Sequence, residues 1–296
     1  MQKMLLNHGW EFSLTPPDEK PEDFAPVDIP HDWLIYDSKD LYKNGDGHYR
    51  RVLDIADASL HYTLRFEGVY MDCDIYLNGE KIFEWKYGYT TFDVPLIGLR
   101  EGENHIEVLV RHRHPNSRWY SGAGIYRNVW LTVKGGSEII PDGTYVTSRR
   151  LEDTFTDGRF ATEIDTEVCG IGAATLRQTV YDACGNARTS AQTEVALSED
   201  VQTVTQTLPA FKPLLWSPES PNLYTLRTEL IQGEEVVDEV TEKIGYKTIE
   251  FTPDKGFFLN GEHCKLLGTC IHHDMGALGS AVNKNAIPSK IISPSP

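Results

Sequence analysis

The sequence lacks long apolar runs and has few basic residues. It holds no stretch of about 18 apolar residues, so no membrane-spanning helix is expected. Its first residues, MQKMLLNHGWEFSL, lack the apolar core of a signal peptide. Lys and Arg number 28 against 44 Asp and Glu, which gives a net charge of −16. Because this charge repels phosphate backbones and anionic lipids, we expect neither nucleic-acid nor membrane binding.

Cysteine is also scarce, and the cysteines are widely scattered. They are Cys73, Cys169, Cys184, Cys264 and Cys270. No two of them have the C-x-x-C spacing of a zinc or redox site, so we expect free thiols, no cofactor and no metal site. Free thiols are typical of a reducing compartment. Together with the missing signal peptide, they predict a cytoplasmic protein.

Sustained helical periodicity is missing from the first part of the chain, and strand patterns take its place. In SLHYTLRFEGV, apolar residues such as Leu64 and Phe66 alternate with polar ones, which is typical of a half-buried strand. Asn78-Gly79 lies between two apolar runs and suits a two-residue turn, because both of its residues must adopt positive φ. These patterns predict a jelly-roll sandwich over residues 1–135.

A second β series follows a turn-rich boundary, KGGSEIIPDGT, at residues 134–144. Its short alternating segments recur roughly every ten residues, as in an immunoglobulin-like sandwich, which we predict over residues 136–245. Three prolines interrupt the series in KPLLWSPESPNLYTL and exclude a central strand there.

The pattern changes again over residues 246–296. An Asn260-Gly261 turn separates two apolar runs, and KLLGTC, residues 265–270, predicts a short buried strand. The last residues, AIPSKIISPSP, contain three prolines and three serines without amphipathic periodicity, so we expect them to be disordered.

Eight stretches stand out in order along the chain. They are IPHDW (29–33), LRFEGVYMDCDIYLNG (64–79), YGYTTFDV (87–94), GENHIEVLV (102–110), NSRWYSGAGIYRNVWL (116–131), LWSPESPNLYTL (215–226), GFFLNGE (256–262) and GTCIHHDMGALG (268–279). Together they resemble glycoside hydrolase family 2, the β-galactosidase and β-glucuronidase group, and their details resemble bacterial β-galactosidases most. The resemblance implies an all-β layout of a jelly-roll sugar-binding sandwich and an immunoglobulin-like β-sandwich, followed by a (β/α)₈ barrel.

The resemblance also implies that this chain contains only the first segment of the barrel. A barrel takes about 200 residues or more, and 50 residues follow Tyr246. The two catalytic glutamates of the family lie well downstream of the first barrel strand. We therefore expect no catalytic residue in this chain and no activity of the chain alone. The reaction implied for the full-length family is hydrolysis of terminal β-D-galactosides with retained stereochemistry.

His272 and Asp274 are candidate sugar ligands, because the resemblance places their loop at the border of the sugar pocket. Two residues apart, they project to one side of an extended backbone, whereas His273 faces away. They can hydrogen-bond sugar hydroxyls, which both donate and accept. The alternative is a structural His–Asp pair that secures the loop. An iron site with two histidines and a carboxylate is excluded because no histidine follows His273.

Asp32, Asn116 and Trp119 complete the candidate substrate-binding set. An indole face stacks on the apolar side of a pyranose, and an amide satisfies its hydroxyls. Gly122 and Gly124 permit the tight backbone path of such a loop. By resemblance, Asp32 contacts the sugar of the full-length enzyme or of a neighbouring subunit. The alternative for Asp32 is a turn or helix cap beside a buried Trp33.

Two other functional interpretations stay open. The chain can be a non-catalytic carbohydrate-binding β-sandwich module, which would bind galactose or lactose without a barrel. It can also be an interaction fragment, in which the unpaired edge of the KLLGTC strand predicts self-association into a homo-oligomer. For the glycosidase region and for the binding module, the expected partner is a β-galactoside or a related carbohydrate.

Overall fold

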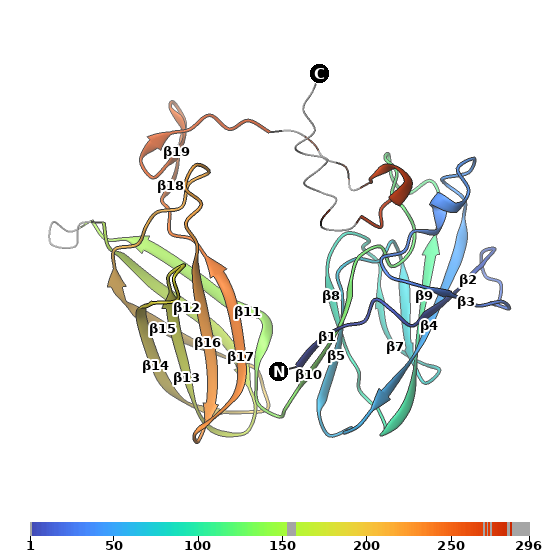
Figure 1. The fold of residues 1–296 in the computed structure, drawn as a ribbon, viewed down its shortest axis with the longest axis horizontal. Coiled ribbons are helices and arrows are strands. Elements are labelled where there is room, and N and C mark those ends of the chain that lie inside the picture. The colour runs from blue at the N-terminus through green and yellow to red at the C-terminus, as the bar shows by residue number, and fades with distance from the viewer. Residues whose placement is uncertain are drawn as a thin grey trace. The chain divides into compact units, whose positions relative to one another are not determined.

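The computed structural model describes residues 2–152, 158–268, 270, 272, 274–282 and 285. Contacts divide them into two compact units. The first unit comprises residues 2–133 with the described residues from Cys270 onward, and the second comprises the described residues from Lys134 to Gly268. Both units are built almost entirely of antiparallel strands (Figure 1), so the all-β prediction is confirmed.

The first unit contains a six-stranded and a four-stranded antiparallel sheet. In spatial order, the six-stranded sheet consists of β3 (Ala25–Val27), β2 (Trp10–Thr15), β4 (Gly45–Ile55), β9 (Gly102–His112), β6 (Cys73–Leu77) and β7 (Glu80–Trp85). The four-stranded sheet consists of β1 (Gln2–Leu5), β10 (Val129–Lys134), β5 (His61–Phe66) and β8 (Phe92–Pro95).

The inward faces of these two sheets share one hydrophobic core. Leu64 and Phe66 of β5 are fully buried, as the alternation in the sequence predicts, and they belong to the same cluster as Ile106 of β9. Asn78 and Gly79 join β6 to β7 with φ angles of 51° and 85°, so the predicted two-residue hairpin turn is confirmed. Period-two burial on both sheets therefore produces a sandwich.

The second unit is a sandwich of three and four strands. Its sheets are β11 (Glu138–Arg150), β12 (Phe160–Cys169) and β15 (Gln202–Phe211), and β14 (Ala187–Leu197), β13 (Gly172–Tyr181), β16 (Tyr224–Gln232) and β17 (Glu235–Ile244). Two buried side chains tie the sheets together. Gln178 Nε2 donates to Thr166 Oγ1 over 2.9 Å, and Gln206 Nε2 donates to the Leu176 carbonyl over 3.0 Å. The proline-rich stretch between β15 and β16 contains no strand, as predicted.

A small sheet ends the second unit. It consists of β18 (Ile249–Thr252), β19 (Gly256–Leu259) and β20 (Glu262–His263), and the predicted Asn260-Gly261 turn joins the last two. The buried strand predicted at KLLGTC is wrong for its described residues, since Leu266 and Leu267 are 65% and 83% exposed and form no strand. No described strand lies beside them to satisfy their backbone groups. The final Pro- and Ser-rich residues lie outside the described part of the chain.

The helical elements whose bounds lie within the described residues are two short 3₁₀ turns, η1 (Trp33–Tyr36) and η2 (Gly276–Leu278). Within those residues, no helix has the length and apolar character needed to cross a membrane.

An aromatic cluster holds the segment that precedes η1. Trp33 stacks on Phe12 with ring centroids 5.6 Å apart, and the His31 ring lies 4.6 Å from that of Phe12. His31 Nδ1 lies 2.7 Å from the Tyr49 hydroxyl oxygen. Gly47 is required beneath this cluster, because a Cβ there would lie 2.3 Å from the Trp33 ring. The backbone position of Asp32, between His31 and Trp33, is thereby fixed.

A buried ion-pair group stabilises the second unit. Lys134 Nζ lies 3.2 Å from Asp238 Oδ2 and 3.1 Å from Glu138 Oε2, and Lys134 and Asp238 are both buried. Asp238 also accepts from the Ile139 backbone N–H over 3.0 Å. Removing the ammonium group would leave two carboxylates in a poorly solvated place without their counter-ion.

Replacing Lys134 by Met should therefore lower the free energy of unfolding by about 3 kcal/mol, the usual cost of breaking one side of a buried pair. Urea unfolding followed by circular dichroism measures this. Arg188→Met is the control, because Arg188 forms a more exposed pair with Asp182 at 3.6 Å and its loss should cost less than about 1 kcal/mol. Equal effects of the two substitutions would contradict the assignment.

His31 makes the stability of the first unit depend on pH. Burial disfavours its imidazolium form and lowers its pKa to about 4, although the nearby Asp32 opposes the shift. Because the unfolded chain binds the proton at a higher pH than the folded chain does, stability is lost as pH falls from about 6.5 towards 4. A shift of this size corresponds to about 3 kcal/mol.

We expect His31→Gln to remove this part of the acid destabilisation. Urea unfolding at pH 7 and pH 4 should show a smaller loss for the variant than for the unsubstituted chain. His105→Gln, at an exposed histidine of β9, is the matched control. His48 and His112, whose pKa values burial also lowers, contribute equally to both proteins. An unchanged acid loss in His31→Gln would show that His31 is not responsible.

Candidate functional site

The candidate site centres on the Asp32 carboxylate, which is 1% exposed. Its Oδ1 accepts from the backbone N–H groups of Leu34 (3.1 Å) and Ala123 (3.0 Å). Its Oδ2 accepts from the Tyr120 hydroxyl (2.7 Å), and from the backbone N–H (2.8 Å) and hydroxyl (3.0 Å) of Ser280. Asp32 is thus the N-cap of η1, as the structural alternative predicts. A direct sugar contact by Asp32 stays a prediction.

Two glycines allow the neighbouring backbones to approach this carboxylate. A Cβ on Gly122 would lie 2.7 Å from Asp32 Oδ2, and one on Gly279 would lie 2.3 Å from it. Both glycines have positive φ, at 69° and 55°, where other residues are strained. Any larger residue at either position would push its segment away from Asp32.

The Tyr120 hydroxyl remains a donor to Asp32 over the working pH range. Burial raises the pKa of its phenol most, and the hydrogen bond to Asp32 and the charges of Asp32 and Asp274 raise it further. The phenol therefore stays protonated beside the carboxylate. The charge of the half-buried Asp274 is one of the causes that raise the pKa of Tyr120, so Asp274 lies close enough to Tyr120 for this charge to act on the phenol.

Trp119 and His272 lie against each other. Their ring centroids are 4.4 Å apart, with an angle of 51° between the ring planes. The Trp119 side chain is 52% exposed, and the Arg118 guanidinium carbon lies 5.0 Å from the Trp119 ring centroid. A half-exposed indole can stack on a polyhydroxylated ring, and an imidazole beside it can hydrogen-bond the hydroxyls of that ring. His273 lies outside the described residues.

Asn116 lies on the same loop as Trp119, but its side chain contacts a different residue, Tyr70. Its Oδ1 accepts from the Tyr70 hydroxyl over 3.3 Å, and the residue itself is exposed. The structure therefore brings together Trp119 with His272, and Asp274 with the surroundings of Tyr120. It places Asn116 beside Tyr70.

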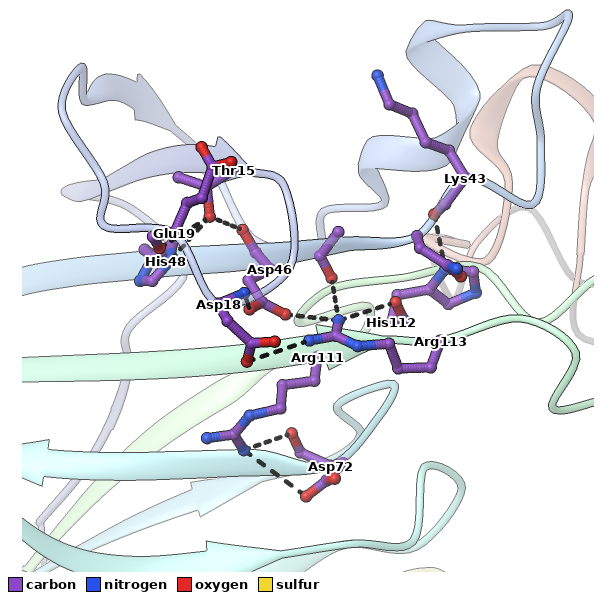
Figure 2. Close-up of polar contacts among 12 residues, drawn as sticks. Thr15, Asp18, Glu19, Lys43, Asp46, His48, Asp72, Arg111, His112 and Arg113 are labelled. Carbon is purple, nitrogen blue, oxygen red and sulfur yellow. Dashed lines mark hydrogen bonds and ion pairs between the residues drawn. The ribbon is translucent and has the colours of Figure 1, made fainter.

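A charged network fixes the strand end from which the Asn116–Trp119 loop leaves (Figure 2). Arg113 donates to Asp46 over 2.6 Å, and the His112 ring donates to the Lys43 carbonyl over 2.8 Å. Burial opposes ionisation of Asp46, but the bonds from Arg113 and from the Asp18 backbone outweigh it and lower the pKa of Asp46. The end of β9 is therefore held to the chain around residues 43–46.

Metal binding finds no support in the part of the chain that the structure describes. Within those residues, no group of three or more His, Cys, Asp or Glu side chains is arranged to hold an ion. The chemistry that the site offers is hydrogen bonding and ring stacking.

Sequence reasoning missed Tyr120 and Ser280 as functional residues. Tyr120 directly follows Trp119 in the same motif, so its position gave a usable signal. Nothing in the sequence around Ser280 indicates a role, because that role depends on a contact with Asp32, 248 residues away along the chain. Gly279 stands out in the sequence as a glycine, but the sequence does not reveal which residue it approaches.

Comparison with known proteins places these features in a family. Residues 142–247 match the model of glycosyl hydrolases family 2. The chain is 34% identical to the β-galactosidase BoGH2A of Bacteroides ovatus, over 95% of this chain and 36% of that protein. It is 29% identical to a β-glucuronidase of Bacteroides fragilis, over 95% of this chain and 43% of that protein.

Solved structures agree with these matches. A glycosyl hydrolase family 2 member from Bacteroides cellulosilyticus superposes with a TM-score of 0.87 at 28% identity, over 98% of this chain and 42% of that one. A β-glycosidase from Bacteroides vulgatus gives 0.85 at 27% identity, over 98% of this chain and 40% of that one. The chain thus spans less than half the length of these proteins. With the eight ordered motifs and the two sandwiches, the matches confirm the resemblance of the chain to glycoside hydrolase family 2.

Proposed function

We propose that this chain supplies the sugar-contacting β-sandwiches of a retaining glycosidase that hydrolyses terminal β-D-galactosides. The contact between Trp119 and His272 carries the proposal, because it unites two residues that were selected separately for sugar binding. The relatives named β-galactosidase, BoGH2A among them, support the reaction class and the sugar.

In this proposal, Trp119 stacks on the apolar face of the sugar while His272 and Asp274 hydrogen-bond its hydroxyls. Asn116 lies exposed on the same loop and meets a more distant hydroxyl. Asp32 accepts hydrogen bonds from Tyr120, which adjoins Trp119, and from Ser280. Each of these side chains binds or orients the sugar, and none is assigned to bond cleavage.

Bond cleavage in a retaining glycosidase requires two carboxyl groups about 5 Å apart, one as nucleophile and the other as acid and then base. Asp32 is unsuited to either role. It is buried, and both of its oxygens already accept hydrogen bonds. In this proposal the described site residues therefore contribute binding rather than catalysis.

A β-glucuronide is the second candidate substrate, and Arg118 favours it. Its guanidinium lies beside the Trp119 ring, where it can pair with a sugar carboxylate. Several relatives are named β-glucuronidase, including the one from Bacteroides fragilis. Galactose remains the first choice because the motif details resemble β-galactosidases most.

A non-catalytic binding module is the remaining alternative, and it differs from the proposal in affinity. A site whose main aromatic face is half exposed covers its ligand poorly, so we expect millimolar binding of galactose. Submillimolar binding would favour the self-contained module. Cytoplasmic location and self-association near Leu266 and Leu267 stay predictions.

We expect Trp119→Ala to weaken galactose binding about tenfold, since an aromatic stacking contact contributes on the order of 1 kcal/mol. Ligand-detected NMR titration with galactose, lactose and glucuronic acid measures the affinity and ranks the two sugar classes. Tyr145→Ala is the matched control, because Tyr145 is an exposed aromatic residue of the second unit. Equal binding by the Trp119 and Tyr145 variants would refute the site.

The purified chain should release no nitrophenol from 4-nitrophenyl β-D-galactoside or β-D-glucuronide. The physical reason is that Asp32, whose two oxygens already accept hydrogen bonds, cannot act as nucleophile or acid, and that in this proposal the other site residues bind the sugar. A continuous absorbance assay at pH 5 to 8 tests this, with a complete β-galactosidase as the positive control. Turnover that persists through further purification and disappears in Asp274→Asn would overturn the non-catalytic assignment.

A further inference from the structure

We infer that Asp32 is a positioning residue that clamps together the two segments that carry Trp119 and His272. The clamp consists of Asp32, Tyr120 and Ser280. The inference rests on the proposed function, because it names the residue on which the geometry of that sugar site depends. It differs from a direct sugar contact, since Asp32 acts through its two partners.

The two oxygens of Asp32 have separate tasks. Oδ1 accepts from Leu34 and Ala123, which are contacts that cap η1 and fix the adjoining loop. Oδ2 accepts all three of the remaining hydrogen bonds, from Tyr120 and Ser280. Five donors therefore share the roughly four lone-pair sites of the carboxylate, so little capacity remains for a sugar hydroxyl.

On one side of the clamp, Tyr120 directly follows Trp119 in the chain. Its hydroxyl bond to Oδ2 is 2.7 Å long, and the backbone two residues further on is held close by Gly122. The Trp119 loop is otherwise exposed, so this bond limits how far its indole can move away from the site.

On the other side, Ser280 ends a compact turn that begins directly after Asp274. Within this turn the Met275 N–H donates to the Gly279 carbonyl over 2.9 Å, and the Leu278 N–H donates to the Met275 carbonyl over 3.0 Å. Fixing Ser280 therefore fixes Met275, and with it the position from which Asp274 and His272 extend. Ser280 is itself buried.

Gly279 shows that the turn must approach the carboxylate closely. A Cβ there would meet Asp32 Oδ2 at 2.3 Å and Ile35 at 2.4 Å. Any side chain at residue 279 would lift the turn away from Asp32 without changing the acid itself. The clamp can thus be opened from either end by chemically unrelated substitutions.

The test compares Asp32→Asn with Gly279→Ala. Asparagine keeps one oxygen for Leu34 and Ala123 but presents an amide NH₂ to the donors on Tyr120 and Ser280. Alanine leaves the carboxylate and the η1 cap intact, so it carries the same test if Asp32→Asn fails to fold. Asp57→Asn is the matched control, because Asp57 bonds Ser59 in an exposed turn.

Two measurements are needed on each folded variant. Hydrogen exchange reports the protection of the Ser280 amide, and the nuclear Overhauser effect between the Trp119 and His272 rings reports the site. We expect at least a tenfold loss of Ser280 protection, loss of the ring signal and about tenfold weaker galactose binding in both variants. Asp57→Asn should match the unsubstituted chain in all three.

Failure of the clamp and failure of the proposed function give different results. Unchanged Ser280 protection and an unchanged ring signal in folded Asp32→Asn and Gly279→Ala would overturn the clamp. If these two signals are lost while no form of the chain binds galactose or glucuronic acid, the clamp stands and the proposed sugar site is wrong. Weakened binding with an intact ring signal would instead return Asp32 to a direct ligand role and overturn the inference.

Discussion

A carboxylate removed from water must be surrounded by hydrogen-bond donors, and Asp32 meets this requirement with donors from separate parts of the chain. They come from η1, from the loop after Trp119 and from the turn that ends at Ser280. Leaving the charge unmatched would cost several kcal/mol. The arrangement of the first unit around the candidate site therefore follows from the solvation of one acid.

The second unit also buries a charged group, but this group is positively charged. The Lys134 ammonium is buried between two carboxylates near the start of β11. Each buried charge is matched by groups of the same unit. Each unit thus encloses a buried charge that its own groups match, and in the first unit this charge belongs to Asp32, one of the residues selected for sugar binding.

Much of the fold could be predicted because its signals are local. Asn78-Gly79 and Asn260-Gly261 specify hairpins through their own backbone preferences. The alternation around Leu64 reports burial within a few residues. The strand expected at KLLGTC was wrong because a strand needs a neighbour as well as apolar residues, and no described strand lies beside Leu266 and Leu267.

The site was predicted less completely because its contacts are distant in sequence. Trp119, His272 and Asp32 were selected from residue type and resemblance, and the structure brings Trp119 and His272 into contact. The partners of Asp32 could not be found in the same way. Ser280 and Gly279 acquire meaning only from a carboxylate about 250 residues earlier, a pairing that no periodicity or spacing rule records.

The hydrogen bonds of Gln178 and Gln206 between the two sheets affect how the second unit unfolds. Gln178 and Gln206 extend from opposite sheets, and each holds a partner on the other. A shift of one sheet along the other would break both bonds together and leave buried side-chain amides without a hydrogen-bond partner. Gradual sliding is therefore costly from its first step, so the two layers should separate in a single cooperative event.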